Sequence, residues 1–553
     1  MKRYSLLMIV CFLCFSCVNE LDEIATPMNQ PEPLNLTDGV IIGEKLQNPY
    51  SLEVMKQACD LVYPPTRGEE PVSDSLIVPN VKYVRFLPAD STEFRILSES
   101  NLELFNYPLD YDILGDPSDY HDPNLPPEQI TWQYTVMPID DPLPIARAEL
   151  LDVGFIPNAM DSDGLFDLST IEKTANDIVL NTQKKDPRVG TPIGNGTTPT
   201  ISEEASSPMG KIQVCDSESG EAKGVKGIKV RARHYWKIRT AYTNDNGEYN
   251  IDLEDFDGVR PRYELRFENK YGFKIGYGMQ LIMPMSAHLE DWNATTYDWV
   301  YDHKLWVACT INNAAYDWYN RCEKEGMSTP PSDLYIWAME MAGGAACPMF
   351  HHNTLQKSGL SIPAIVGQYF EFDNNTANLN IFNSLLELIA PDVVVFRVRD
   401  VDVSTRVLYQ YTSHELSHAT HFQQVGSTVD ERAMWWADVI QYEVACGIVE
   451  GPYEATGVPH SGKVGVTEMW AHAVGHIMEF EYQSKSLGDY NSGYWFKPEI
   501  VWELYKGGMT LQQINKSMTI DIVTLEDFKY QLVEDNEIYK SLIEKQFSDK
   551  LGI

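Results

Sequence analysis

The sequence is poor in basic residues, and this deficit excludes one class of partner. Its 553 residues include 43 Lys and Arg against 80 Asp and Glu, which gives a formal net charge of −37. Binding to nucleic-acid phosphates or to anionic membrane faces needs clustered positive charge. The composition therefore predicts an acidic surface and no nucleic-acid partner.

Long apolar runs are also scarce. Residues 1–17 combine a basic start with an apolar stretch that is too short to span a bilayer, and no later run approaches about 18 apolar residues. This segment resembles a bacterial lipoprotein signal that ends at Cys17. The acidic, Pro-rich stretch after it is similar to the tethers of Bacteroidetes surface lipoproteins. The resemblance implies an acylated Cys17, a membrane anchor, and an outer-membrane lipoprotein that can be exposed at the cell surface. An ordinary secretory signal cleaved nearby is the alternative.

Cysteine is sparse outside this segment. Three of the nine cysteines lie in residues 1–17, no Cys-x-x-Cys occurs, and the remaining spacings suggest no disulfide framework. A zinc site built from thiolates is therefore not expected. For Cys347 we predict a buried structural cysteine in preference to a nucleophile.

What the chain does contain is a His-Glu-x-x-His pattern at residues 414–418, in an apolar, helix-compatible context. Residues four apart lie on one face of a helix, so His414 and His418 can hold one metal ion. Glu415 is close enough to polarise a metal-bound water without ligating the metal. Fifty residues after His418, Glu468 opens a second helix-periodic run and can supply a third ligand.

This pairing of helices resembles the gluzincin class of zinc metallopeptidases over roughly residues 390–485. The resemblance implies Zn²⁺ held by His414, His418 and Glu468, with Glu415 as the general base in peptide-bond hydrolysis. In thermolysin-like members an Asp stands four residues after the ligand Glu, whereas this chain has His472.

Other residues compete for roles at the predicted site. Asp430 is an alternative third ligand, since its spacing is near that of aspzincins, and His421 is expected to be structural or to lie beside the ligands. We expect the adjacent pair at 351–352 to be a chance pair. The residue that stabilises the oxyanion is left open among four candidates: His472, His476, Tyr490 and Tyr494.

The predicted fold is a multidomain α+β chain. We expect a tether and N-terminal segment at 18–75, a small α/β domain at 76–180, a linker at 181–209, a β-sandwich at 210–284 and a mostly helical zincin-like domain at 285–553. The alternating strands and the Thr…Asn-Gly-x-Tyr hairpin of 210–284 resemble the carboxypeptidase regulatory-like domain, which is a transthyretin-type sandwich.

Local patterns predict individual elements within this frame. Helices are expected over 49–61 with Ser51 as N-cap, and over 90–97, 305–308, 314–319, 334–341 and 433–440. Strands are expected over 83–86 and 132–136, and in five segments between 210 and 267. Two strands are predicted to lead into the motif, over 391–396 and 406–409. The first of them is expected to be an edge strand beside the substrate. A loop that borders the cleft is predicted over 451–465.

Two functions fit these features. The first is a membrane-anchored zinc metallopeptidase whose substrate is a protein or peptide. The alternative is a surface glycan- or protein-binding lipoprotein with a catalytically silent zincin-like domain. The His-Glu-x-x-His pattern with a distant Glu favours the enzyme, because a binding role leaves that constellation unexplained.

Overall fold

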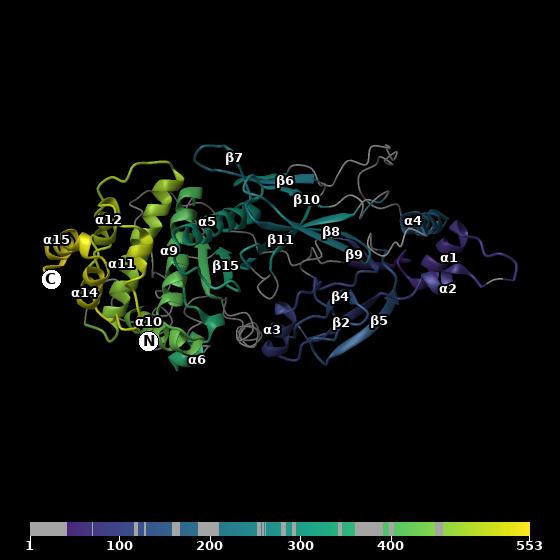
Figure 1. The fold of residues 1–553 in the computed structure, drawn as a ribbon, viewed down its shortest axis with the longest axis horizontal. Coiled ribbons are helices and arrows are strands. Elements are labelled where there is room, and N and C mark those ends of the chain that lie inside the picture. The colour runs from purple at the N-terminus through teal and green to yellow at the C-terminus, as the bar shows by residue number, and fades with distance from the viewer. Residues whose placement is uncertain are drawn as a thin grey trace, which may run out of the picture.

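The computed structural model describes most of the chain from residue 41 onward. The segments outside the described part are 1–40, 69, 115–119, 127–128, 158–165, 186–208, 252–255, 257–258, 260, 278–283, 290–294, 341–344, 360–390, 398–402 and 448–456. The expected signal segment with Cys17, the tether up to residue 40 and most of the linker lie outside the described residues. The described chain is mixed α and β with helices gathered in its C-terminal part, as expected (Figure 1).

Residues 41–185 form what we call the N-terminal unit. Its elements are β1 Ile41–Lys45, α1 Leu52–Val62, α2 Val72–Leu76, β2 Val81–Phe86, α3 Ser91–Glu99, β3 Tyr111–Leu114, β4 Gln133–Pro138, β5 Ala148–Gly154 and α4 Leu168–Lys185. Strand β1 pairs with β3, and β2 lies between β4 and β5 in an antiparallel sheet. The Ser51 side chain accepts a hydrogen bond from the Val54 N–H at the start of α1, which confirms the predicted helix and its cap. The helix expected over 90–97 and both strands expected here are also present.

Buried polar contacts fasten the N-terminal unit to the strands that follow it. The Tyr107 hydroxyl donates to Glu264 Oε1 over 2.7 Å, and the Arg231 guanidinium pairs with the same carboxylate. The buried Lys237 ammonium lies 2.9 Å from Glu172 Oε1 on α4. Because removing one partner of a buried ion pair leaves an uncompensated charge, these contacts oppose separation of the unit.

The central strands form two sheets that pack on each other. They are β6 Met209–Cys215, β7 Ala222–Gly224, β8 Ile228–His234, β9 Lys237–Tyr242, β10 Glu248–Asn250, β11 Arg262–Asn269, β12 Lys274–Tyr277, β13 Ser286–Leu289 and β14 Thr295–Tyr297. One sheet has the order β10-β6-β14 with β7 on β6, and the other contains β12-β11-β8-β9 with β13 on β11. The five strands predicted between 210 and 267 are all present. Ile212 and Leu265, one from each sheet, are fully buried in a common core.

The second of these sheets continues into the C-terminal part. Strands β15 Tyr335–Glu340 and β17 Val393–Arg397 extend it in parallel from β12, and β16 Ala345–Ala346 pairs antiparallel with β17. The sheet therefore crosses the predicted boundary between 284 and 285.

Two predictions about these strands need correction. Residues 334–341 were expected to be helical, but β15 is a strand that lies between β12 and β17. Its side chains from Tyr335 to Ala338 are all buried, so it shows none of the alternation that marks a half-exposed strand. The strand expected over 391–396 is present as β17, but β16 and not β17 ends the described sheet.

Helices dominate the remainder. They are α5 His303–Glu325, η4 Phe350–His352, α6 Thr354–Ser358, α9 Thr405–Gln424, α10 Val429–Gly447, α11 Ser461–Tyr482, α12 Glu499–Lys506, α13 Leu511–Asn515, α14 Leu525–Asp535, η5 Glu537–Tyr539 and α15 Lys540–Leu551. The helices predicted over 305–308, 314–319 and 433–440 are confirmed within α5 and α10.

Two segments expected to lack helix prove helical in part. Residues 406–409 are the first turn of α9, where the Ser404 side chain caps the helix by accepting from the Val407 N–H. The loop predicted over 451–465 gives way to α11 at Ser461.

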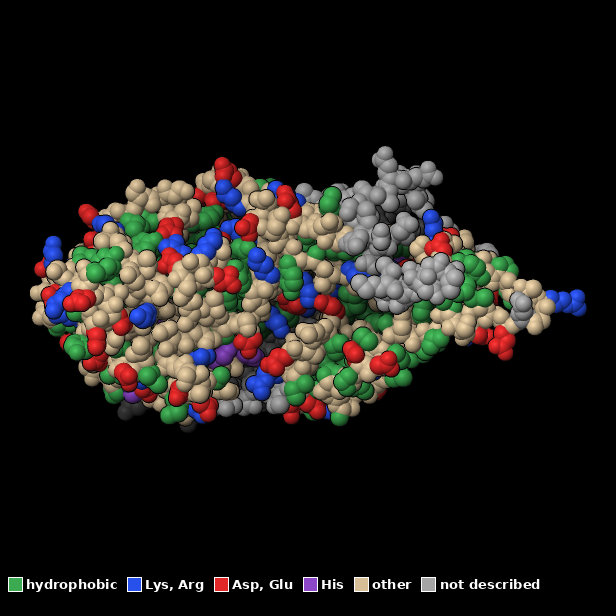
Figure 2. All heavy atoms as spheres, in the orientation of Figure 1, with side chains coloured by type: hydrophobic (Ala, Val, Ile, Leu, Met, Phe, Trp, Pro, Cys, Tyr) green, Lys and Arg blue, Asp and Glu red, His purple; other side chains and the backbone are tan. Residues whose placement is uncertain are grey.

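Helix α5 packs against α9 and is hydrogen-bonded to it. The Trp318 indole N–H of α5 donates to Thr420 Oγ1 over 3.0 Å and lies 3.2 Å from the Leu416 carbonyl oxygen, both on α9. In Figure 1 the two helices lie beside the parallel strands, while the N-terminal helices α1, α2 and α4 lie at the opposite end of the molecule. On the face drawn in Figure 2, Lys and Arg side chains are scattered among Asp and Glu.

Candidate metal centre

The site is built on two antiparallel helices, α9 and α11. Gly475 of α11 allows their close approach, because a Cβ there would lie 2.9 Å from the Gln410 carbonyl oxygen and 3.1 Å from the His414 Cβ. Five residues before Gly475 on α11, the Trp470 indole N–H donates to the Ser417 carbonyl oxygen of α9 over 3.1 Å. The chain thus holds the middle of α11 directly against the His-Glu-x-x-His segment.

Three donor groups from these helices converge. His414 Nε2 and His418 Nε2 are 3.1 Å apart. Glu468 of α11 places Oε1 3.3 Å from His418 Nε2 and Oε2 3.6 Å from His414 Nε2. In a tetrahedral site with metal–ligand bonds of about 2.0–2.2 Å, donor atoms are separated by about 3.3–3.6 Å. The three groups therefore have nearly the spacing that a single ion requires.

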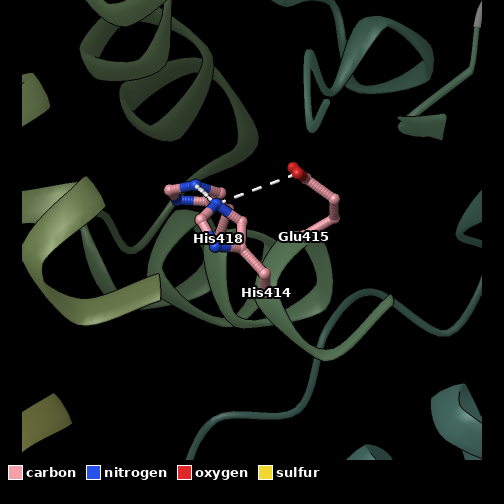
Figure 3. Close-up of side chains that lie close together, drawn as sticks. All are labelled: His414, Glu415 and His418. Carbon is pink, nitrogen blue, oxygen red and sulfur yellow. Dashed lines mark hydrogen bonds and ion pairs between the residues drawn. The ribbon is translucent and has the colours of Figure 1, made fainter. Parts of the chain in front are cut away.

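Glu415 lies beside this triangle. Its Oε1 is 3.8 Å from His414 Nε2, further than the mutual distances of the three converging groups. Figure 3 shows the two imidazoles meeting at their ring nitrogens, with the Glu415 carboxylate facing them from one side. The residue is fully buried, as are both histidines and Glu468 to within a few per cent.

The electrostatics favour neutral imidazoles. Burial lowers the pKa of His414 well below its ordinary value, and the neighbouring His472 and His418 lower it further. Neutral histidine is the form that ligates metals, so no proton has to be displaced at neutral pH. A metal between the two Nε2 atoms would replace the contact that these atoms make with each other, and the buried His418 Nδ1 has no hydrogen-bond partner among the described residues. Two neutral imidazoles and a carboxylate fit a divalent cation, and the structure is compatible with a metal here without identifying which.

No protein-family model matches this chain. No curated protein matches it in sequence either. The interpretation of the site therefore depends on the chemistry and spacing of these side chains.

The structure separates the competing ligands. Asp430 is exposed in the first turn of α10, where its carboxylate lies 3.2 Å from Lys357 Nζ and away from the histidines. His421 is fully buried against the rings of Trp435 and Trp436, and neither of its ring nitrogens has a hydrogen bond within the described part of the chain. His421 is thus not among the converging donors.

The four oxyanion candidates lie at different depths. His472 Nε2 is 3.6 Å from Glu468 Oε2, and the ring of Tyr494 lies 4.8 Å from the His472 ring. His476, one turn along α11, instead places Nδ1 3.2 Å from Glu479 Oε2 and packs on Tyr490. The structure thus places His472 beside Glu468, whereas the sequence spacing presented His472 only as a departure from a pattern.

The pair at 351–352 has a structural explanation. His352 Nδ1 lies 2.8 Å from the buried Asp392 Oδ1, and its Nε2 lies 3.3 Å from Asp333 Oδ1. Burial disfavours the charged ring, but the two carboxylates outweigh it and raise the pKa of His352 to about 10. His352 is therefore a charged partner of these aspartates.

His351 has a different environment. It lies with Glu99 and Asp333 in a partly exposed group of donors. The sequence gave no signal of this group, because Glu99 is more than 200 residues from the other two. Exposed acidic groups of this kind are common without an ion.

Cys347 matches its expectation. It is buried and free, and burial raises the pKa of its thiol well above the ordinary value, so the thiolate nucleophile is disfavoured.

Proposed function

We propose that the protein is a zinc-dependent metallopeptidase of gluzincin type. The observation that carries this proposal is the spacing of His414, His418 and Glu468, with the Glu415 carboxylate beside them. A purely structural role for these helices would not require a second buried carboxylate that faces the donors without joining them.

The donor set supports zinc over Ca²⁺ and Mg²⁺. Imidazole nitrogens suit zinc, whereas Ca²⁺ and Mg²⁺ prefer shells made entirely of oxygen. Three protein ligands leave the fourth position of a tetrahedral zinc for water, which is the pattern of catalytic rather than structural sites. When bound, zinc would lower the pKa of that water towards about 7 and polarise the substrate carbonyl.

Residues of this chain supply the proton transfers. Glu415 accepts the proton of the attacking water on its carboxylate and then delivers it to the leaving amine. Its burial keeps bulk water away from the carboxylate, which strengthens its interactions with the reacting groups. His472, beside Glu468, is the best placed of the four candidates to donate a hydrogen bond to the developing oxyanion, with Tyr494 next to it.

The sheet supports a peptide as the substrate. Strand β16 ends the described sheet on the side of β17, and it lies close to α9. An extended peptide can add to such an edge through main-chain hydrogen bonds and so lie along the helix that carries the donors.

The cellular setting is also part of the proposal. Acylation of Cys17 would anchor the protein in the outer membrane, where its substrate would be an external protein or peptide. Within the described residues no helix is long and apolar enough to cross a membrane. Mass spectrometry of the N-terminal peptide from native membranes tests this, since an unmodified N-terminus that starts elsewhere removes the anchor and leaves the metal centre unaffected.

The function is tested with the form that begins at residue 18. The N-terminal unit is kept because its buried ion pairs with the central strands oppose truncation. The parent, Glu415→Gln and Asp430→Asn are incubated with a mixture of denatured proteins, and the new N-termini are identified. Asp430→Asn is the matched control, since it removes an acidic group from a neighbouring helix outside the site.

We expect cleavage by the parent and by Asp430→Asn, and its loss with a chelator. Glu415→Gln should retain the metal while its turnover falls by about 10²–10⁴-fold. If the parent cleaves no protein or peptide although it holds one zinc per chain, the peptidase proposal is wrong. Equal binding of a glycan or protein by the parent and Glu415→Gln would then favour the binding function.

A further inference from the structure

The turn between β6 and β7 reaches from the central strands to the start of the metal-binding helix. Ser217 donates its backbone N–H to Thr405 Oγ1 over 3.0 Å, and its own side-chain oxygen accepts from the Thr405 N–H over 2.8 Å. The Ser404 hydroxyl donates to Glu218 Oε1 over 2.8 Å. Glu218 thus binds the N-cap of α9, and Ser217 binds the first residue of α9 reciprocally.

These contacts complete the N-terminal cap of α9. The first N–H groups of a helix have no partner inside the helix. Ser404 caps one of them from within the segment, at Val407, while Ser217 caps another from a strand connection almost 190 residues earlier. The end of the helix is therefore defined by a residue of the β-sandwich region.

The same turn also binds the end of α11. The Tyr482 hydroxyl donates to Asp216 Oδ2, and its ring stacks on Tyr409 of α9 with centroids 3.9 Å apart. Asp216 is itself held, since its Oδ1 accepts the backbone N–H of Glu218 over 2.8 Å. The turn is therefore hydrogen-bonded to both helices.

An ion pair between an exposed arginine and a buried glutamate links the two helices at this end. Arg406 of α9 lies 3.5 Å from Glu218 through Nε and donates from Nη1 to Glu479 of α11 over 3.0 Å. Glu479 Oε2 in turn lies 3.2 Å from Nδ1 of His476. A continuous polar path thus runs from the turn to the helix that presents Glu468.

We propose that Asp216, Ser217 and Glu218 are positioning residues for the metal centre, because they fix the register of α9 against α11. The donors come from both helices, so a slip of one helix along the other changes the distances between Glu468 and the two histidines. The central strands are then an integral part of the centre. This inference rests on the metal site of the proposed function and deepens it. Zinc affinity is one of its two readouts.

The test compares four versions of the 18–553 form: the parent, Ser217→Ala combined with Glu218→Gln, Ser217→Thr, and Glu221→Gln. Glu221→Gln is the matched control, because Glu221 lies in the same hairpin and its carboxylate pairs with the exposed Lys223. Zinc affinity is measured by competition with a chromophoric chelator, and folding is checked by circular dichroism.

We expect the double variant to bind zinc about tenfold more weakly, in the range found for residues that orient metal ligands. Ser217→Thr keeps the hydroxyl and should retain the parent's affinity, and Glu221→Gln should match the parent. If these residues only stabilise the fold, the double variant should have a lower melting temperature and Ser217→Thr should not preserve the zinc affinity. Parent-like zinc affinity in a folded double variant overturns the proposal.

A second readout separates this proposal from the zinc assignment. Hydrogen–deuterium exchange of the metal-free proteins is compared over 405–412 and 474–482. Faster exchange in the double variant, with Glu221→Gln unchanged, supports the positioning role even if the parent binds no zinc and the peptidase proposal fails. Exchange in the double variant that equals the parent's in both segments refutes the positioning role. This readout needs no metal, so it also applies if the double variant is too unstable to be loaded with zinc.

Discussion

Removal of Glu468 tests the metal centre most directly, because this residue comes from a different helix than the histidines. We consider Glu468→Ala with Asp430→Ala as its counterpart. Structural zinc sites with four ligands bind with about 10–16 kcal/mol, so one ligand contributes about 2.5–4 kcal/mol. At about 1.4 kcal/mol for each factor of ten, the loss of Glu468 should weaken zinc binding by about 10²–10³-fold.

The distances explain why no other residue should replace Glu468. Its two oxygens lie 3.3 Å from His418 Nε2 and 3.6 Å from His414 Nε2, whereas Glu415 Oε1 lies 3.8 Å from His414 Nε2. Alanine at 468 would leave two imidazoles from a single helix to hold the ion. Asp430 is exposed and pairs with Lys357, so its loss should change the affinity by less than about twofold.

The assay is zinc content after dialysis against a mild chelator, followed by affinity from chelator competition. Circular dichroism verifies that each variant is folded. One zinc per chain in the parent and in Asp430→Ala, with little in Glu468→Ala, is the expected result. Full zinc in Glu468→Ala together with its loss in Asp430→Ala would refute the gluzincin interpretation and favour Asp430 as the third ligand.

Three further predictions follow from the packing and charges around the site. Gly475→Ala should push α11 away from α9 and cost about 1–3 kcal/mol of stability with weaker zinc binding, whereas Gly488→Ala, with no atom within 4 Å of the added Cβ, should be neutral in thermal denaturation. Stability should fall as pH rises from about 7 towards 10, because His352 is protonated in the fold with a pKa of about 10 and in the unfolded chain with a pKa of about 6.5; His352→Gln should flatten this part of a pH series of denaturant titrations. Trp318→Phe should keep an aromatic ring but remove part of the buried indole and leave Thr420 Oγ1 and the backbone of α9 without their indole donor, at a cost of at least about 1–2 kcal/mol in urea denaturation, and an unchanged midpoint would contradict this role.

The sequence predicted structural features correctly where they depend only on residues that are close in the chain. Ser51 identified the start of α1 because a hydroxyl at that position binds the N–H of Val54. The spacing of His414 and His418 placed both on one face of a helix because four residues make about one turn. These relations involve neighbours in the chain, so they hold before any tertiary contact forms.

Patterns that depend on burial were predicted less well. The aromatic spacing of 334–341 fits a helix, but β15 lies between two parallel strands and is buried on both faces, which removes the alternation that marks a strand. Residues 406–409 appeared strand-like because they are rich in Val, Leu and Tyr. They are helical because Ser404 and the distant Ser217 cap the helix before them.

The sequence by itself determined the chemistry of the candidate site: two imidazoles one helical turn apart and a carboxylate next to the first. Only the tertiary structure decided which distant groups join them. It placed Glu468 and His472 against the histidines, because Gly475 lets α9 and α11 approach closely. It left Asp430 exposed on α10. Contacts between residues far apart in the chain depend on how whole helices and sheets pack, and that packing is a property of the assembled core that no local pattern encodes.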